Sequence, residues 1–216
     1  MPKRPLPTEP LSPKIEYTLQ QPKQTVFHVL AIASSTGGPD ALLKVFAGLK
    51  GKLKHLPIFI TQHMPPIFTA ALAEHISLHG ERPCKEGVDG EAVEHGMTYV
   101  APGGFHMLVR KEGDKMTLKL TQDPPVNSCR PSADPMFDSI SKAYGRNVLG
   151  LVLTGIGADG AAGIRTIVEN GGSVFAQDKE TSVVYGMPRS AAETGMLESI
   201  QPLEQIPNYL IRRCGG

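Results

Sequence analysis

Residues 26–38, VFHVLAIASSTGG, join a nearly continuous apolar run to a loop of hydroxyl-bearing residues and glycine. A short apolar run that stops at turn formers is typical of a strand buried on both faces of a sheet. Pro39 comes next, and the apolar residues of DALLKVFAGL then recur at helical spacing. This stretch therefore predicts a buried strand, a loop and a helix in succession.

Two later stretches repeat the pattern. Residues 56–61, LPIFIT, lead through QHMPP into a helical pattern over residues 67–78. Residues 148–154, VLGLVLT, lead through GIGADG into another helical pattern over residues 161–170. Buried strands that alternate with helices indicate a parallel sheet covered by helices on both sides.

The pattern changes over residues 84–120. There, glycine-rich turns separate short pieces of alternating apolar and polar residues at 97–101, 105–110 and 116–120. Such pieces favour an antiparallel hairpin region beside the main sheet. The expected fold class is therefore α/β, a doubly wound and mostly parallel sheet with helices on both faces and a small antiparallel hairpin region.

The composition fits one globular domain. Of 216 residues, 40% are hydrophobic and 20% are charged, which is ordinary for a soluble protein. Residues 1–25 hold six of the 19 prolines and no glycine, so we expect a disordered or extended linker-like leader there. Residues 26–214 are expected to form a single folded domain.

Charge and cysteine usage limit the partners and the compartment. The formal net charge is only +1, so no overall field attracts nucleic acid or an anionic membrane, and we expect neither nucleic-acid binding nor membrane insertion. Three cysteines without a C-x-x-C pair argue against a disulfide framework. No signal peptide or long apolar run is present. A cytoplasmic location is expected.

Polar residues follow each of the three strongest predicted strands. Ser34 and Ser35 follow the first, His63 follows the second, and Asp159 follows the third. Ligands and catalytic groups gather at the carboxyl ends of parallel strands. A serine, a histidine and a carboxylate together can carry out acyl transfer, because the histidine accepts the hydroxyl proton and the carboxylate stabilises the imidazolium.

Each of these residues has a simpler interpretation. The serines are good helix caps, His63 can be an ordinary loop residue, and Asp159 can be the N-cap of the helix that begins at Gly160. His75 and His79 lie one helical turn apart, but no third ligand accompanies them, so we expect no metal site.

A different class of function competes with acyl transfer. Gly155, Gly157 and Gly160 form the pattern G-x-G-x-x-G between a predicted strand and a helix, and Asp178 ends the next strand. This spacing matches a dinucleotide-binding fingerprint. Against it, the charge of Asp159 inside the loop would face the pyrophosphate. A dinucleotide-binding protein remains the alternative.

Longer runs resemble one known family. These runs lie in the same order along residues 29–197 and are IASSTGGPDAL, FITQHMPPIFTAALAEHI, YVAPGGFHM, RPSADPMF, VLTGIGADGAAGIRTI and VVYGMPRSAAETG. They resemble the catalytic domain of the chemotaxis protein-glutamate methylesterases, the CheB family. The resemblance implies hydrolysis of glutamate γ-methyl esters on chemoreceptors with release of methanol, deamidation of certain receptor glutamines, and no cofactor.

The resemblance also implies residue roles. The family's serine directly precedes T-G-G, which selects Ser35 over Ser34, and the same comparison gives His63 and Asp159 as its partners. Thr36 and the backbone N–H near Ile156 are implied supports for the oxyanion or the triad. Two adjacent hydroxyls stand where the family often has a single one, so the choice of Ser35 rests on alignment.

Further implications concern the substrate and regulation. Arg130 and Met187 are candidate substrate contacts. The expected partners are the methylated cytoplasmic helices of chemoreceptors. Most members of the family carry an N-terminal receiver domain, which we do not find in this chain; a receiver domain in cis or in trans is therefore a further expected partner.

Overall fold

A sheet of seven parallel strands forms the centre of the molecule. The computed structural model describes residues 17–215. The strand order is β3-β4-β2-β1-β7-β8-β9, and every neighbouring pair is parallel. In chain order the strands are β1 (Val29–Ser34), β2 (Ile58–Gln62), β3 (Cys84–Glu86), β4 (Thr98–Val100), β7 (Val148–Val152), β8 (Ser173–Gln177) and β9 (Ser199–Gln201).

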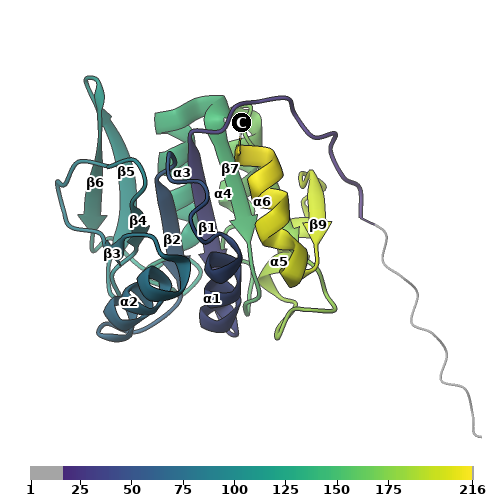
Figure 1. Cartoon of the computed structure of the whole chain (residues 1–216), viewed down its shortest axis with the longest axis horizontal. Helices are drawn as coiled ribbons and strands as arrows, with labels where there is room; N and C mark the ends of the chain where they lie inside the picture. The colour runs from purple at the N-terminus through teal and green to yellow at the C-terminus, as the bar shows by residue number, and fades with distance from the viewer. Residues whose placement is uncertain (1–16, 216) are drawn as a thin grey trace, which may run out of the picture.

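Helices cover both faces of this sheet. Figure 1 views it with α1, α2 and α6 in front and α3 and α4 behind. The front helices are α1 (Gly38–Gly48), α2 (Phe68–Gly80) and α6 (Ile206–Cys214), the last preceded by the short helix η2 (Leu203–Gln205). The other face is covered by α3 (Ala133–Tyr144), α4 (Ala161–Glu169) and α5 (Met187–Glu193), with η1 (Gly145–Asn147) following α3.

The apolar runs form the core as the sequence predicts. Every residue of β1, β2 and β7 is buried, because these strands are central and both of their faces are covered. Leu42 and Phe46 of α1 fill the core on one face, and Phe137 of α3 and Ile164 of α4 fill it on the other. The predicted α/β class is confirmed.

The hairpin region is smaller than predicted. Among the strands within residues 17–215, only β5 (His106–Glu112) and β6 (Lys115–Thr121) form an antiparallel pair. Strand β5 packs on α3, where the backbone N–H of Val109 donates to Ser139 Oγ. The piece at residues 97–101 was wrongly assigned to this region. It forms β4, which is buried and pairs in parallel with β2. Its shortness and the glycines around it imitate a hairpin strand.

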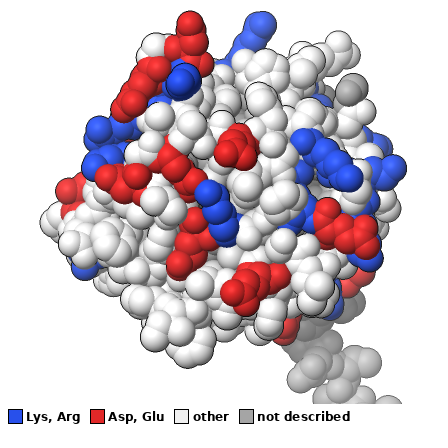
Figure 2. Space-filling view, turned by 60° about the vertical axis from the view of Figure 1, so that its left-hand side comes forward, with Lys and Arg blue, Asp and Glu red and all other residues white. Residues whose placement is uncertain are grey.

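Opposite charges are mixed on the surface that carries the hairpin. Figure 2 shows acidic and basic side chains interspersed there, with neither sign dominating. Ion pairs between Lys119 and Asp89 and between Lys85 and Glu91 contribute to this pattern. Local pairing of this kind agrees with the near-zero net charge.

Part of the predicted leader is packed onto the domain. Residues 1–16 lie outside the described residues, and residues 17–28 form no helix or strand. The backbone N–H of Gln20 donates to the carbonyl of Leu197, and Lys23 Nζ donates to the carbonyl of Gly172. Packing therefore begins before Val26, where the sequence pattern placed the start of the domain.

Within residues 17–215, no helix is both long enough and apolar enough to cross a membrane.

Candidate active site

The strand order brings three polar loops to one edge of the sheet. Strand β1 lies between β2 and β7, with Ser34 paired to Gln62 and Ala33 paired to Val152. Their carboxyl ends therefore meet, and the loops that follow them carry the predicted serine, histidine and aspartate.

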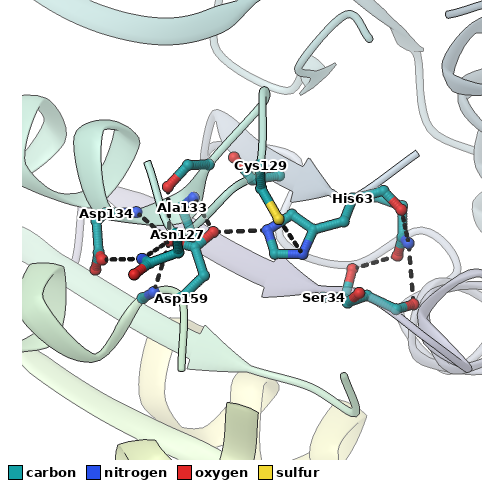
Figure 3. A network of polar contacts seen from close by, with 12 residues as sticks. Ser34, His63, Asn127, Cys129, Ala133, Asp134 and Asp159 are labelled. Carbon is teal, nitrogen blue, oxygen red and sulfur yellow. Dashed lines mark hydrogen bonds and ion pairs between the residues drawn. The ribbon is translucent and has the colours of Figure 1, made fainter. Parts of the chain in front are cut away.

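His63 and Asp159 form a close pair at this edge (Figure 3). Nε2 of His63 lies 2.6 Å from Oδ2 of Asp159, although 96 residues separate the two in the chain. The Asp159 side chain is 2% exposed and that of His63 is 12% exposed. A buried carboxylate in contact with a slightly exposed imidazole is the arrangement that orients a general base.

Asp159 accepts hydrogen bonds from the start of α3 and from the turn that precedes it. Its oxygens accept hydrogen bonds from Ser132 Oγ at 2.6 Å, from the backbone N–H of Ala133 at 2.6 Å and of Asp134 at 3.2 Å, and from Asn127 Nδ2 at 3.0 Å. Burial alone would raise the pKa of Asp159, but the hydrogen bonds from His63, Ser132 and Ala133 outweigh it and lower the pKa to about 2. The carboxylate is therefore ionised at neutral pH.

Asp159 is not the N-cap of α4, which was the simpler interpretation of this residue. The N-cap of α4 is Gly160, at φ 92°, and the helix begins at Ala161. The carboxylate does accept from the backbone N–H of Gly160, at 3.1 Å, but its other backbone contacts belong to the N-terminus of α3. The favourable end of that helix dipole helps to keep the charge.

The two adjacent serines have different environments. Ser34 is fully buried, and its hydroxyl donates to Gln62 Oε1 at 2.7 Å (Figure 3). Ser35 is partly exposed, and its hydroxyl has no hydrogen-bond partner among the described residues. The structure thus gives Ser34 a structural bond and leaves Ser35 available to a substrate.

Backbone contacts fix Ser35 between two loops. Its N–H donates to the carbonyl of Thr154 at 3.0 Å, and its carbonyl accepts from Gln62 Nε2 at 2.9 Å. Gly155 lies so close that a Cβ there would approach Ser35 Cβ to 2.8 Å. The lack of a side chain at residue 155 is therefore needed for this packing.

The second ring nitrogen of His63 faces a thiol. Nδ1 lies 3.5 Å from Cys129 Sγ, and the structure shows no hydrogen bond between His63 and the Ser35 hydroxyl. Burial, followed by the negative charge of Asp159, raises the pKa of Cys129. The thiol is therefore neutral at neutral pH and leaves the lone pair of Nδ1 without a strong donor.

A pocket of about 270 Å³ opens beside this nitrogen. Its walls are His63, Met64, Pro65, Cys129, Arg130 and Pro131. Among residues 17–215, no cluster of three His, Cys, Asp or Glu side chains is placed to bind a metal ion. The arrangement offers acid–base and nucleophilic chemistry from the side chains themselves.

Comparison with known proteins identifies the family. The family model described as CheB methylesterase matches residues 30–210. The chain belongs to this family. A crystal structure of the Thermotoga maritima CheB methylesterase catalytic domain has a TM-score of 0.83 to this chain at 37% identity, covering 87% of this chain and 99% of that one. The resemblance noted from the sequence motifs is confirmed.

Curated relatives are longer than this chain. A protein-glutamate methylesterase/protein-glutamine glutaminase of Rhodopseudomonas palustris is 47% identical over 89% of this chain and 50% of its own length. A relative of the same name, numbered 1, from Rhodospirillum rubrum is 49% identical over 85% of this chain and 48% of its own length. The chain spans about half the length of the curated relatives it matches.

Membership of the CheB methylesterase family argues against the dinucleotide alternative, and the geometry explains why the fingerprint misleads. The buried charge of Asp159 occupies the loop of Gly155, Gly157 and Gly160 and is committed to His63. Asp178 Oδ1 accepts from the N–H and the hydroxyl of Thr181 within a turn. The G-x-G-x-x-G spacing thus belongs to a loop that presents the Asp159 carboxylate.

The two predicted support residues lie at the same edge. Thr36 is exposed, and its carbonyl accepts from Thr154 Oγ1 at 2.9 Å. Ile156 is 62% exposed, and its backbone N–H has no partner among the described residues. This N–H belongs to the residue after Gly155, which packs against Ser35, and a free N–H of this kind is suited to bind a developing oxyanion.

The two predicted substrate contacts have mainly supporting positions. Arg130 Nη1 donates to the carbonyls of Gln122 and Asp123 and so holds that loop, although Arg130 also lines the pocket. Met187 is 1% exposed, and its Sδ would be only 2.4 Å from a Cβ at Gly155. Met187 is therefore packed against the loop at Gly155, and its role as a substrate contact stays a prediction.

Sequence reasoning missed three residues that contact the His63 and Asp159 pair, namely Asn127, Cys129 and Ser132. They precede α3, which follows no strand of the main sheet, so a search confined to strand ends passes over them. Ser132 had a usable signal, because a serine directly before a helical pattern is a preferred N-cap.

Proposed function

We propose that this domain hydrolyses glutamate γ-methyl esters on chemoreceptors, with Ser35 as nucleophile, His63 as general base and Asp159 as the residue that orients it. The observation that carries this proposal is the 2.6 Å contact of His63 with Asp159 beside the partly exposed Ser35. The names of the similar proteins, protein-glutamate methylesterase/protein-glutamine glutaminase, support the same chemistry.

The reaction begins with attack on the ester. Because Nε2 of His63 is bound to Asp159, Nδ1 is the nitrogen that accepts the proton as Ser35 Oγ attacks the γ-carbonyl carbon. The hydrogen bond between Ser35 and Nδ1 forms in the complex with substrate, as catalytic hydrogen bonds often do. The ionised Asp159 stabilises the resulting imidazolium.

The tetrahedral intermediate then collapses to an acyl-enzyme, which water hydrolyses in a second stage. The C–O bond to the methoxy group breaks, and the methoxy oxygen takes the proton from His63 Nδ1 and leaves as methanol. Water attacks the acyl carbon while Nδ1 accepts one of its protons, and Ser35 recovers a proton as glutamate is released. The N–H of Ile156 and the N-terminal end of α1 near Thr36 stabilise the oxyanion in both stages.

Glutamine deamidation follows the same route. The amide nitrogen takes the proton from His63 and leaves as ammonia, and hydrolysis of the acyl-enzyme again gives glutamate. No cofactor or metal enters either reaction.

The partners follow from the substrate. We expect the domain to act on the methylated cytoplasmic helices of chemoreceptors, to be located in the cytoplasm, and to be regulated by a receiver domain in cis or in trans. A mostly neutral surface with mixed charges suits recognition of a protein segment by local contacts.

Methanol release tests the proposal. Receptor-containing membranes methylated with a labelled methyl group are incubated with the chain, and volatile label is counted; membranes with unmethylated receptors that carry glutamine are assayed for ammonia. We expect time-dependent methanol release that depends on the domain. Absence of release from several receptor preparations by folded protein would contradict the proposed function.

A further inference from the structure

We propose that Asn127 is a positioning residue that holds the Asp159 carboxylate in place for His63. This inference rests on the proposed function of the site. Asn127 forms no hydrogen bond with His63 or Ser35, so its effect would pass through Asp159.

The first observation is the tight turn that presents Asn127. Val126 and Cys129 pair through two backbone hydrogen bonds, of 3.1 and 2.9 Å, so the turn between them contains only Asn127 and Ser128. Both central residues have positive φ, 52° and 62°. This conformation is typical of a two-residue turn and is one that asparagine adopts more easily than most residues.

The second observation concerns the two hydrogen bonds that the Asn127 side chain donates. Asn127 Nδ2 donates to Asp159 Oδ1 at 3.0 Å and to Asp134 Oδ2 at 2.8 Å (Figure 3). One amide nitrogen thus uses both of its protons to bridge two carboxylates. From the other side of the turn, Cys129 approaches His63 Nδ1. The turn therefore contacts both His63 and Asp159.

The bridge counters a repulsion. Burial is the largest influence on Asp134 and raises its pKa. The backbone hydrogen bond from Gly163 lowers the pKa, the negative charge of Asp159 raises it, and the net effect is a rise. Two neighbouring carboxylates disfavour each other's charged form unless donors lie between them. Asn127 supplies such a donor and fixes the distance between Asp134 and Asp159.

The remaining contacts of Asp159 do not replace this one. Ser132 and the N–H groups of Ala133 and Asp134 approach from the start of α3, and the N–H of Gly160 approaches from the residue that follows Asp159. Asn127 comes from a separate turn, and its donation to Oδ1 is the one that also links Asp159 to Asp134. Without it, we expect the Asp159 side chain to rotate or shift, so that the hydrogen bond to His63 lengthens.

The test uses two glycine variants of the same turn. Asn127→Gly removes the amide and keeps a residue suited to positive φ, whereas Ser128→Gly keeps the amide and changes the other central residue. Both residues are exposed, so both variants should fold. For Asn127→Gly we expect kcat for methanol release to fall about 10- to 100-fold with KM changed less than about twofold. Ser128→Gly should behave like the unchanged protein.

A second readout does not depend on turnover. Proton NMR of protein labelled with ¹⁵N-histidine reports the His63 Nε2–H that donates to Asp159. We expect a low-field signal in the unchanged protein and in Ser128→Gly, and a shifted or broadened one in Asn127→Gly. Equal signals and equal kcat in both variants would overturn the positioning role. If the unchanged protein shows the signal but releases no methanol, the proposed function fails, and the NMR comparison still decides the role of Asn127.

Discussion

Nε2 of His63 lies 2.6 Å from Oδ2 of Asp159, and this contact assigns the two ring nitrogens. In the serine-protease template the aspartate binds Nδ1 and the serine faces Nε2. Here the aspartate binds Nε2, so Nδ1 is left for Ser35. Strand order brings the three residues to one edge of the sheet, because β1 carries the serine between the strands that deliver His63 and Asp159.

Asp159→Asn should lower kcat by about 10⁴-fold, the effect of the equivalent change in the protease template. An amide at this position can turn its NH₂ toward His63 and favour the wrong tautomer, and it would also meet the donors Ser132 and Ala133. Steady-state methanol release measures the change. A loss smaller than tenfold would show that the carboxylate does not orient His63.

Asp159 should also make stability depend on pH. Its pKa is about 2 in the folded protein, below its usual 3.8, so the stabilisation is fully present above about pH 4 and is lost as the pH falls toward 2. Urea unfolding of the unchanged protein and of Asp159→Asn gives the two free energies of unfolding. Their difference should shrink over this window, and a constant difference would refute the assigned hydrogen bonds.

Gly155→Ala should impair turnover by displacing Ser35. A Cβ there would lie 2.4 Å from Met187 Sδ and 2.8 Å from Ser35 Cβ. We expect kcat to fall at least about 10-fold, since small misplacements of reacting groups cost up to about 10²-fold.

Gly150→Ala is the matched control for that change. Its Cβ would lie 3.0 Å from Val174 of the neighbouring strand β8, and its nearest neighbours do not include Ser35. It should lower the thermal midpoint with little effect on kcat. Equal losses of kcat in both variants would indicate general loosening of the domain and not displacement of the serine.

Arg213→Ala should destabilise the domain by about 3 kcal/mol, because it leaves a buried charge unpaired. Arg213 donates two hydrogen bonds, each of 2.8 Å, to Glu198, whose side chain is 2% exposed, and it also holds the carbonyl of Lys23. Chemical denaturation measures the loss. Arg212→Ala, on the exposed neighbour, is the control, and an equal loss there would contradict the assignment.

The main sheet and the edge that carries the candidate site were predictable because they depend on local patterns. The apolar runs before Ser34, His63 and Asp159 are long enough to be recognised as buried strands, and each ends in a polar loop. The adjacency of these strands was not predictable from spacing, since 96 residues separate His63 from Asp159.

Shorter and less regular features escaped prediction. Residues 97–101 contain a three-residue strand, Thr98–Val100, whose partner is decided by tertiary packing and not by its own pattern. Asn127 and Ser132 reach Asp159 from 32 and 27 residues away, through a turn and a helix start whose positions depend on the whole fold. The choice between Ser34 and Ser35 required family alignment, and the buried bond of Ser34 to Gln62 now gives it a physical reason.

That choice is tested most directly by methanol release from Ser35→Ala and Ser34→Ala assayed side by side. Ser35→Ala should lose about 10⁶-fold in kcat, as expected for a triad serine. Ser34→Ala should lose about 1 to 3 kcal/mol of stability, because Gln62 Oε1 is left without its donor, yet keep most of its activity. An inactive Ser34→Ala beside an active Ser35→Ala would contradict the account.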